Sequence, residues 1–139
     1  MQKILIKRQG SFVIAAFAAI GLIVVSAGAA LSQGRQVTVQ MNALHGGRIS
    51  GSAIFTQRPK GVLVTVILKN ALHTAIPVRI HGGKCPTPNR KPLFDLTDTN
   101  FGVSNTYLPG VQLSSLMRDV VVVHQPNNLK AYLACGYIR

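Results

Sequence analysis

Arg79, His81 and His124 are the residues of this chain whose types and spacing suit a metal ion or an anion. Arg79 and His81 stand two apart in an apolar stretch, and His124 follows the valine run Val120–Val123. Residues two apart on a β-strand point to the same face. Arg79 and His81 therefore share a face, and His124 joins them if the two strands meet. Imidazole suits copper, zinc and nickel, so a copper site at His81 and His124 is chemically possible.

Two ligands are too few to define a coordination geometry, so other interpretations stay open. In one, His81 and His124 are partly exposed side chains at strand ends, while His45 and His73 are solvated in loops. In another, His45 or His73 helps His81 and His124 to hold copper. In a third, Arg79 is an anion contact, because its guanidinium offers a planar fork of donors.

Other catalytic chemistry finds little support in the composition. The chain has only three acidic residues, all of them aspartates, which argues against catalysis by paired carboxylates. Ser114 and Ser115 lack the glycine context of a nucleophile elbow. The sequence also contains neither a phosphate-binding glycine loop nor a Cys-x-x-Cys motif. The sequence therefore predicts no catalytic residue.

The N-terminal segment 1–31 has the features of a secretory signal peptide. Lys3, Lys7 and Arg8 precede a long apolar stretch, and Ala27-Gly28-Ala29 offers a cleavage site. The alternative is an uncleaved, helical membrane anchor, since the stretch is long enough to span a bilayer. In either case we expect the rest of the chain to be secreted, periplasmic or part of the cell envelope.

The two cysteines, Cys85 and Cys135, fit such an oxidising compartment. A bridge between them would close a long loop and stabilise a small domain by about 4 kcal/mol in the chain-entropy treatment. The alternative is a pair of buried free thiols. Because the chain has the marks of export, we expect the disulfide.

The chain is strongly basic, with fifteen Lys and Arg residues and a formal net charge of +12. High positive charge is typical of nucleic-acid binding, but export and the dispersed positions of the basic residues argue against it. We expect anionic envelope partners instead, such as cell-wall polymers, lipid head groups or small oxyanions. A membrane is expected to be contacted only through an uncleaved N-terminal segment. The sequence specifies no oligomeric state.

Alternating apolar residues and turn signals predict seven or eight short antiparallel strands, which favours an all-β sandwich or barrel. We interpret residues 32–36 as a linker and 37–139 as one β-domain. Residues 82–89 are predicted to be a loop, and 111–116 fit either a strand end or one helical turn. The predicted strands are 37–42, 48–57, 62–68, 76–81, 93–96, 104–108 and two that flank a turn at 125–128.

Several short motifs follow one another in a characteristic order. They are Gly51–Gln57, Gly61–Thr65, Val78–His81, the loop cysteine Cys85, Arg118–His124 and Ala134–Ile138. This set, which covers residues 37–138, resembles copper/zinc superoxide dismutase, and most of all the shortened, exported dismutase-like domains of bacteria. Ile80–Gly83 also resembles the related chordin-type domain. The resemblance implies a flattened Greek-key β-barrel whose disulfide joins the loop after the copper-binding strand to the final strand, matching Cys85 and Cys135.

The metal sites of this chain are incomplete when compared with the family's pattern. The family has His-x-His on its copper strand, where this chain has Arg79 and His81, and His124 matches the copper histidine after the valine run. The histidine that bridges copper and zinc has no counterpart and the zinc loop looks deleted, so zinc is not expected. The family's anion-guiding arginine is replaced by Tyr132.

These losses imply a degenerate, non-catalytic domain that serves as a binding or structural module of the envelope. The alternative is a copper-binding protein, or a weak copper-dependent superoxide dismutase, that uses His81 and His124. Dismutation needs copper held in a defined geometry, and Arg79 would place a guanidinium charge beside it. We therefore expect that the domain is not a competent dismutase.

Overall fold

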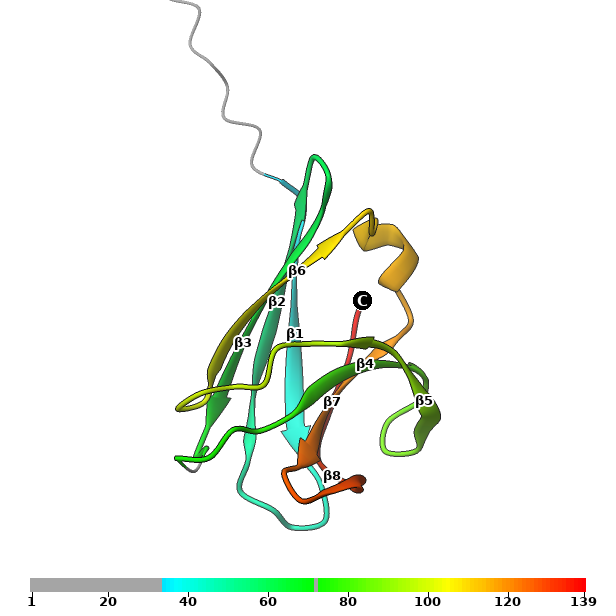
Figure 1. Ribbon diagram of the computed structural model, residues 1–139. Coiled ribbons are helices and arrows are strands. Elements are labelled where there is room, and N and C mark those ends of the chain that lie inside the picture. Colours follow the sequence, from blue (N-terminus) through cyan, green and yellow to red (C-terminus); the bar gives the residue numbers. More distant parts are fainter. Residues whose placement is uncertain (1–33, 72) are drawn as a thin grey trace, which may run out of the picture. The chain divides into compact units, whose positions relative to one another are not determined.

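One antiparallel sheet of eight strands contains most of the described part of the chain, residues 34–71 and 73–139 of the computed structural model (Figure 1). The predicted signal segment 1–31 lies outside the described residues. A single 3-10 turn, η1, precedes the last two strands. The elements are β1 Gln36–Ala43, β2 Ser50–Arg58, β3 Gly61–Lys69, β4 Val78–Gly83, β5 Pro88–Asp95, β6 Val103–Pro109, η1 Leu113–Leu116, β7 Val120–Gln125 and β8 Asn128–Tyr137.

The strand order β5-β4-β7-β8-β1-β2-β3-β6 contains a Greek key. Strands β4 and β5 form a hairpin, β6 pairs with β3, and β7 returns to pair with β4, which is a crossing connection of the Greek-key type. The sheet curls, so β2 and β3 lie across the core from β4 and β7, while β5 and β6 are its two ends (Figure 1). The predicted all-β Greek-key architecture is therefore confirmed.

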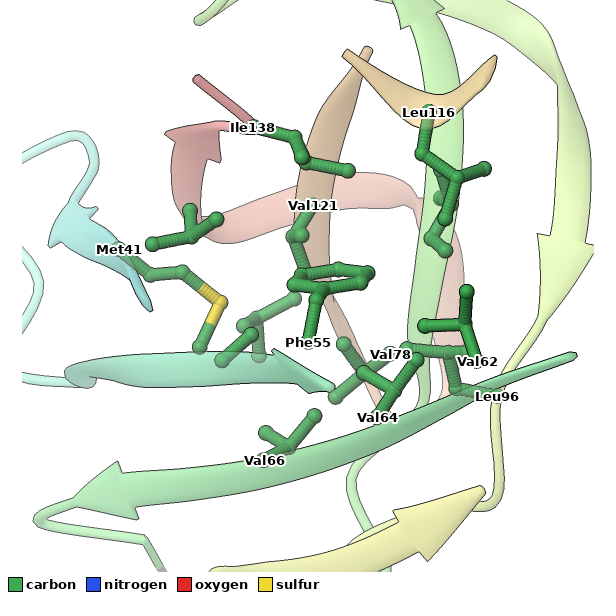
Figure 2. Close-up of a cluster of buried hydrophobic side chains, with 14 of the residues drawn as sticks. Met41, Phe55, Val62, Val64, Val66, Val78, Leu96, Leu116, Val121 and Ile138 are labelled. Carbon is green, nitrogen blue, oxygen red and sulfur yellow. The ribbon is translucent and has the colours of Figure 1, made fainter. Parts of the chain in front are cut away.

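The main core lies inside this curl and follows from the period-two pattern of the strands. On β2, Ala53 and Phe55 are fully buried, while their outward-facing neighbours are partly accessible. Figure 2 shows the ring of Phe55 among valines that come from β3, β4 and β7. Burying one side chain of this size contributes about 1.5–3 kcal/mol to stability. Because the buried residues come from most of the strands, their combined burial stabilises the curled sheet.

The segment 82–89 differs from its predicted loop. Strand β4 extends to Gly83, and β5 begins at Pro88 and continues through Pro92. Proline disfavours a central strand because it cannot donate a hydrogen bond, but it is tolerated at an edge or a bulge. Strand β5 is an end strand, and its pairing with β4 shifts register around His81, so both conditions are met.

Residues 111–116 form the 3-10 turn rather than a strand end. Leu113 and Leu116 are buried by it, and the Leu113 backbone N–H donates to the side-chain oxygen of Gln57 at 2.7 Å. The anchoring partner is therefore a β2 residue far away in sequence. Among the residues the structure describes, no helix has the length and apolar character needed to cross a membrane.

Candidate metal centre

His81 and His124 lie on the outer face of the sheet, away from the main core. His81 is on β4 and His124 on β7, and these two strands pair directly, with His81 opposite Val120. Val121 and Val123 point into the main core, whereas Val120 and Val122 belong to a second buried cluster. A register shift between Val123 and His124, where β7 pairs with β8, is of the bulge type that re-aims a side chain.

The two imidazoles are in direct contact and buried. Their Nε2 atoms are 3.1 Å apart and their ring centroids 5.2 Å apart. Each histidine is only 1% exposed. The interpretation of His81 and His124 as partly exposed strand-end side chains is therefore wrong. Their rings contact one another, Asn89 on β5, and Leu129 and Tyr132 on β8.

Two backbone carbonyls determine where the protons of these imidazoles reside. The Nδ1 atom of His81 lies 2.7 Å from the carbonyl oxygen of Asn89, and that of His124 lies 2.7 Å from the carbonyl oxygen of Leu129. A carbonyl oxygen can only accept a hydrogen bond, so each Nδ1 must carry a proton and donate it. In the neutral rings both Nε2 atoms are then unprotonated, and their lone pairs face one another.

Such a pair is stable when something positive lies between the two nitrogens, either one shared proton or a metal ion. Burial is the main factor that lowers the pKa of His124; the Leu129 carbonyl opposes it, and the charges of His81 and Arg79 lower it further. A metal ion bonds to imidazole nitrogen at about 2.0–2.1 Å, so nitrogens 3.1 Å apart are close enough to share one ion. The donor set therefore fits a cation that accepts imidazole, such as copper.

The predicted disulfide is present and holds the covering segment in place. Cys85 precedes β5, Cys135 is on β8, and their Cα atoms are 5.9 Å apart. The Tyr137 hydroxyl donates to the Cys85 carbonyl at 3.4 Å. The bridge fixes one end of the segment that delivers the Asn89 carbonyl to His81. A disulfide also indicates an oxidising, extracellular-type environment.

Two consecutive glycines allow this segment to fold back over His81. Gly83 has φ +96°, a conformation that side chains rarely adopt. A Cβ at Gly83 would lie 2.9 Å from Oδ1 of Asn89, and one at Gly82 would lie 3.0 Å from its Nδ2. The absence of side chains at 82 and 83 therefore allows Asn89 to lie this close to β4.

Arg79 lies on the outer face of β4 but is paired with a carboxylate. Its Nε is 2.8 Å from Oδ1 of Asp95, the residue opposite it on β5. Tyr132, on β8, turns its ring edge-on to both histidines, with centroids 5.2 Å from His124 and 6.4 Å from His81. Tyr132 thus covers the pair from the β8 side.

The other two histidines lie apart from this pair. His45 is exposed in the turn between β1 and β2, and His73 stacks edge-on against Phe101 at a centroid distance of 5.4 Å. Within residues 34–71 and 73–139, no group of three histidine, cysteine or acidic side chains is placed to hold a metal ion. This fold therefore does not place His45 or His73 where either could hold copper together with His81 and His124.

Asn89 and Leu129 are the parts of the candidate site that sequence reasoning missed. Their contribution is a backbone carbonyl, which every residue type has, so no residue signal marks them.

No family model matches this chain, and neither a curated protein nor a solved structure is significantly similar to it.

Proposed function

We propose that this chain is an exported, superoxide dismutase-like β-domain that binds copper through His81 and His124 and is not a competent dismutase. The observation that carries the proposal is the pair of buried Nε2 atoms, 3.1 Å apart, whose lone pairs face one another. The Greek-key sheet and the Cys85–Cys135 bridge agree with the resemblance seen in the sequence. The signal-like segment 1–31 and the bridge together support export.

The residues around the pair hold it in one orientation. The carbonyls of Asn89 and Leu129 keep the protons on Nδ1, and such outer hydrogen bonds typically change metal affinity by about 10–100-fold. Copper, when bound, would supply a redox-active centre. The chain itself contributes two imidazoles and a buried environment, and the residue beside them is an arginine rather than a third histidine.

Copper titration of the oxidised, purified chain tests the binding. We expect one Cu(II) ion per chain, observed as visible absorption and electron paramagnetic resonance signals of nitrogen ligation. His81→Gln and His124→Gln should each weaken this binding by at least about 100-fold, because loss of a ligand costs more than the roughly 10–100-fold typical of losing an outer hydrogen-bond partner. His45→Gln and His73→Gln are matched controls that should leave it unchanged. If neither His81→Gln nor His124→Gln changes the copper affinity, the copper proposal fails.

A superoxide-decay assay tests the second half of the proposal. The copper-loaded chain should accelerate superoxide decay little beyond the metal-free chain, because a two-histidine site does not impose the coordination that redox cycling requires. Rapid decay that depends on copper and is lost in His124→Gln would refute the claim that the domain is not a competent dismutase.

A second candidate function is a binding module for anionic envelope components. It is favoured by the net charge of +12 and needs no metal. Arg79 was its predicted contact, and an anion there would have to compete with Asp95. Binding of a cell-wall polymer that Arg79→Gln abolishes and copper does not affect would favour this function over the first.

A further inference from the structure

A cavity of about 360 Å³ lies between the beginning of β5 and the beginning of β8. Its lining comprises Arg90, Leu129, Lys130 and Tyr132. Arg90 follows Asn89, whose carbonyl accepts from His81, and the Leu129 carbonyl accepts from His124. The two backbone segments that orient the imidazoles therefore also form the walls of this cavity.

Three of the side chains that line the cavity can donate hydrogen bonds. Arg90 contributes a guanidinium, Lys130 an ammonium and Tyr132 a hydroxyl. Within residues 34–71 and 73–139 the ion pair joins Arg79 to Asp95, so neither Arg90 nor Lys130 is paired with a carboxylate. No carboxylate lines the cavity. Several donors around one cavity without a carboxylate are complementary to an anion with several oxygens.

The size and the apolar part of the lining narrow the ligand class further. A water molecule occupies about 30 Å³, so a cavity of about 360 Å³ accommodates much more than a bare inorganic ion. Leu129 is 40% exposed, and the Tyr132 ring is only partly buried. Together they provide an apolar wall beside the three donors.

We propose that this cavity binds an organic oxyanion, a carboxylate or a phosphate monoester that carries an aromatic or short aliphatic group. The charged group contacts Arg90 and Lys130, the Tyr132 hydroxyl donates to one of its oxygens, and the apolar group packs on Leu129. The site needs no metal, so it stands or falls independently of the copper proposal.

Titrations of the full, oxidised and metal-free chain in the presence of a chelator test this site. The probes are phenyl phosphate and benzoate, which distinguish the two oxyanions, with benzamide and inorganic phosphate as partial mimics that lack the charge or the apolar group. We expect saturable binding of phenyl phosphate or benzoate at least tenfold tighter than binding of benzamide or inorganic phosphate. Amide signals of Leu129 and Tyr132 should shift in nuclear magnetic resonance spectra.

Charge-matched variants separate this site from general attraction to a basic protein. Arg90→Gln and Lys130→Gln should each weaken the better probe about tenfold or more, as expected when a charge-assisted hydrogen bond is lost. Lys60→Gln and Lys69→Gln remove the same charge from exposed positions at the ends of β3 and should change the affinity less than twofold. Equal losses in both sets, or equal binding of benzamide and benzoate, would overturn the proposal.

Discussion

At the scale of single residues, the chemistry of His81 and His124 is set by what their Nδ1 atoms contact. Because both Nδ1 atoms donate to carbonyl oxygens at 2.7 Å, only the facing Nε2 atoms are left to bind something. One proton turns their contact into a hydrogen bond, but a second would place two cations in contact in a buried site. The pair therefore has room for one positive charge, a proton or a metal ion.

This arrangement predicts that the metal-free protein loses stability as the pH falls. Burial lowers the pKa of His124 below its ordinary value of about 6.5, so the unfolded chain binds a proton at His124 in addition to any proton on His81, and the folded pair resists this second proton. The stabilising contribution is complete above about pH 6.5 and decreases as the pH falls toward the lower folded-state pKa. We expect the urea midpoint to fall between about pH 7 and pH 5, and His124→Gln to reduce this decrease.

An unchanged pH dependence in His124→Gln would contradict this assignment. His45→Gln is the matched control, because His45 is exposed in a turn and should leave the slope as in the parent chain. The affinity for copper should also decrease as the pH falls over the same range, since protons and the metal ion compete for the same nitrogen atoms.

At the scale of elements, the decisive feature is the short connection between β4 and β5. The connection is closed at one end by the glycine pair and at the other by Pro88, which is buried. Here the chain reverses so tightly that Asn89 reaches back to His81. The strands alone bring the two histidines to one face, but this connection buries His81.

Gly83→Ala should therefore damage both stability and the candidate site. The new Cβ would meet Asn89 at 2.9 Å, and the positive φ adds a penalty of about 1 kcal/mol. We expect a total loss of about 1–3 kcal/mol in the free energy of unfolding and a weakened copper affinity. Urea unfolding and the copper titration measure the two effects.

Gly110→Ala is a close control for this substitution. Gly110 also has a positive φ, of +73°, but a Cβ there has no atom within 4 Å. Its substitution should cost only the backbone penalty and leave copper affinity unchanged. If Gly110→Ala lowered the copper affinity as much as Gly83→Ala does, the contact of Asn89 with the glycine pair would not explain the loss of affinity.

At the scale of the whole domain, one sheet separates two buried regions. The main core fills the curl, and the second cluster, Val120, Val122 and Cys135, lies on the outer face with the histidine pair nearby. The disulfide ties the outer cluster to the segment before β5 across a sequence separation of 50 residues. Substitutions in the main core and on the outer face should therefore have different effects on stability and on copper affinity.

Removing the disulfide should weaken both the fold and the site. Closing a loop of 50 residues stabilises a domain by about 4 kcal/mol in the chain-entropy treatment. The double variant Cys85→Ser and Cys135→Ser should lose a stability of this order, and its copper affinity should fall because the Asn89 carbonyl is no longer held. Unchanged copper affinity in the folded double variant would show that the bridge does not organise the site.

Phe55→Ala, by contrast, should damage the core alone. Phe55 is fully buried in the curl, and deleting such a ring typically costs about 3–5 kcal/mol. Copper affinity, measured on the fraction that remains folded, should equal that of the parent chain. A large change would mean that the two faces of the sheet are coupled.

Much of this architecture could be predicted from local pattern. Alternation placed Val78 and Ile80 in the core and Arg79 with His81 on the opposite face, as the structure has them. The disulfide was expected because the chain has the marks of export, and its partners followed because the chain has only two cysteines. Strand β5 was predicted too short, because its prolines resemble loop residues unless the strand is known to lie at an edge.

The amino-acid sequence by itself determined the all-β class, the alternating faces of the strands and the pairing of Cys85 with Cys135, since each depends on local periodicity or on a unique pair. Only the tertiary structure decided that the Nε2 atoms of His81 and His124 meet at 3.1 Å. That distance depends on the register between two strands 43 residues apart and on carbonyls supplied by Asn89 and Leu129. Neither is encoded by a residue type, because pairing register and backbone acceptors belong to the folded chain as a whole.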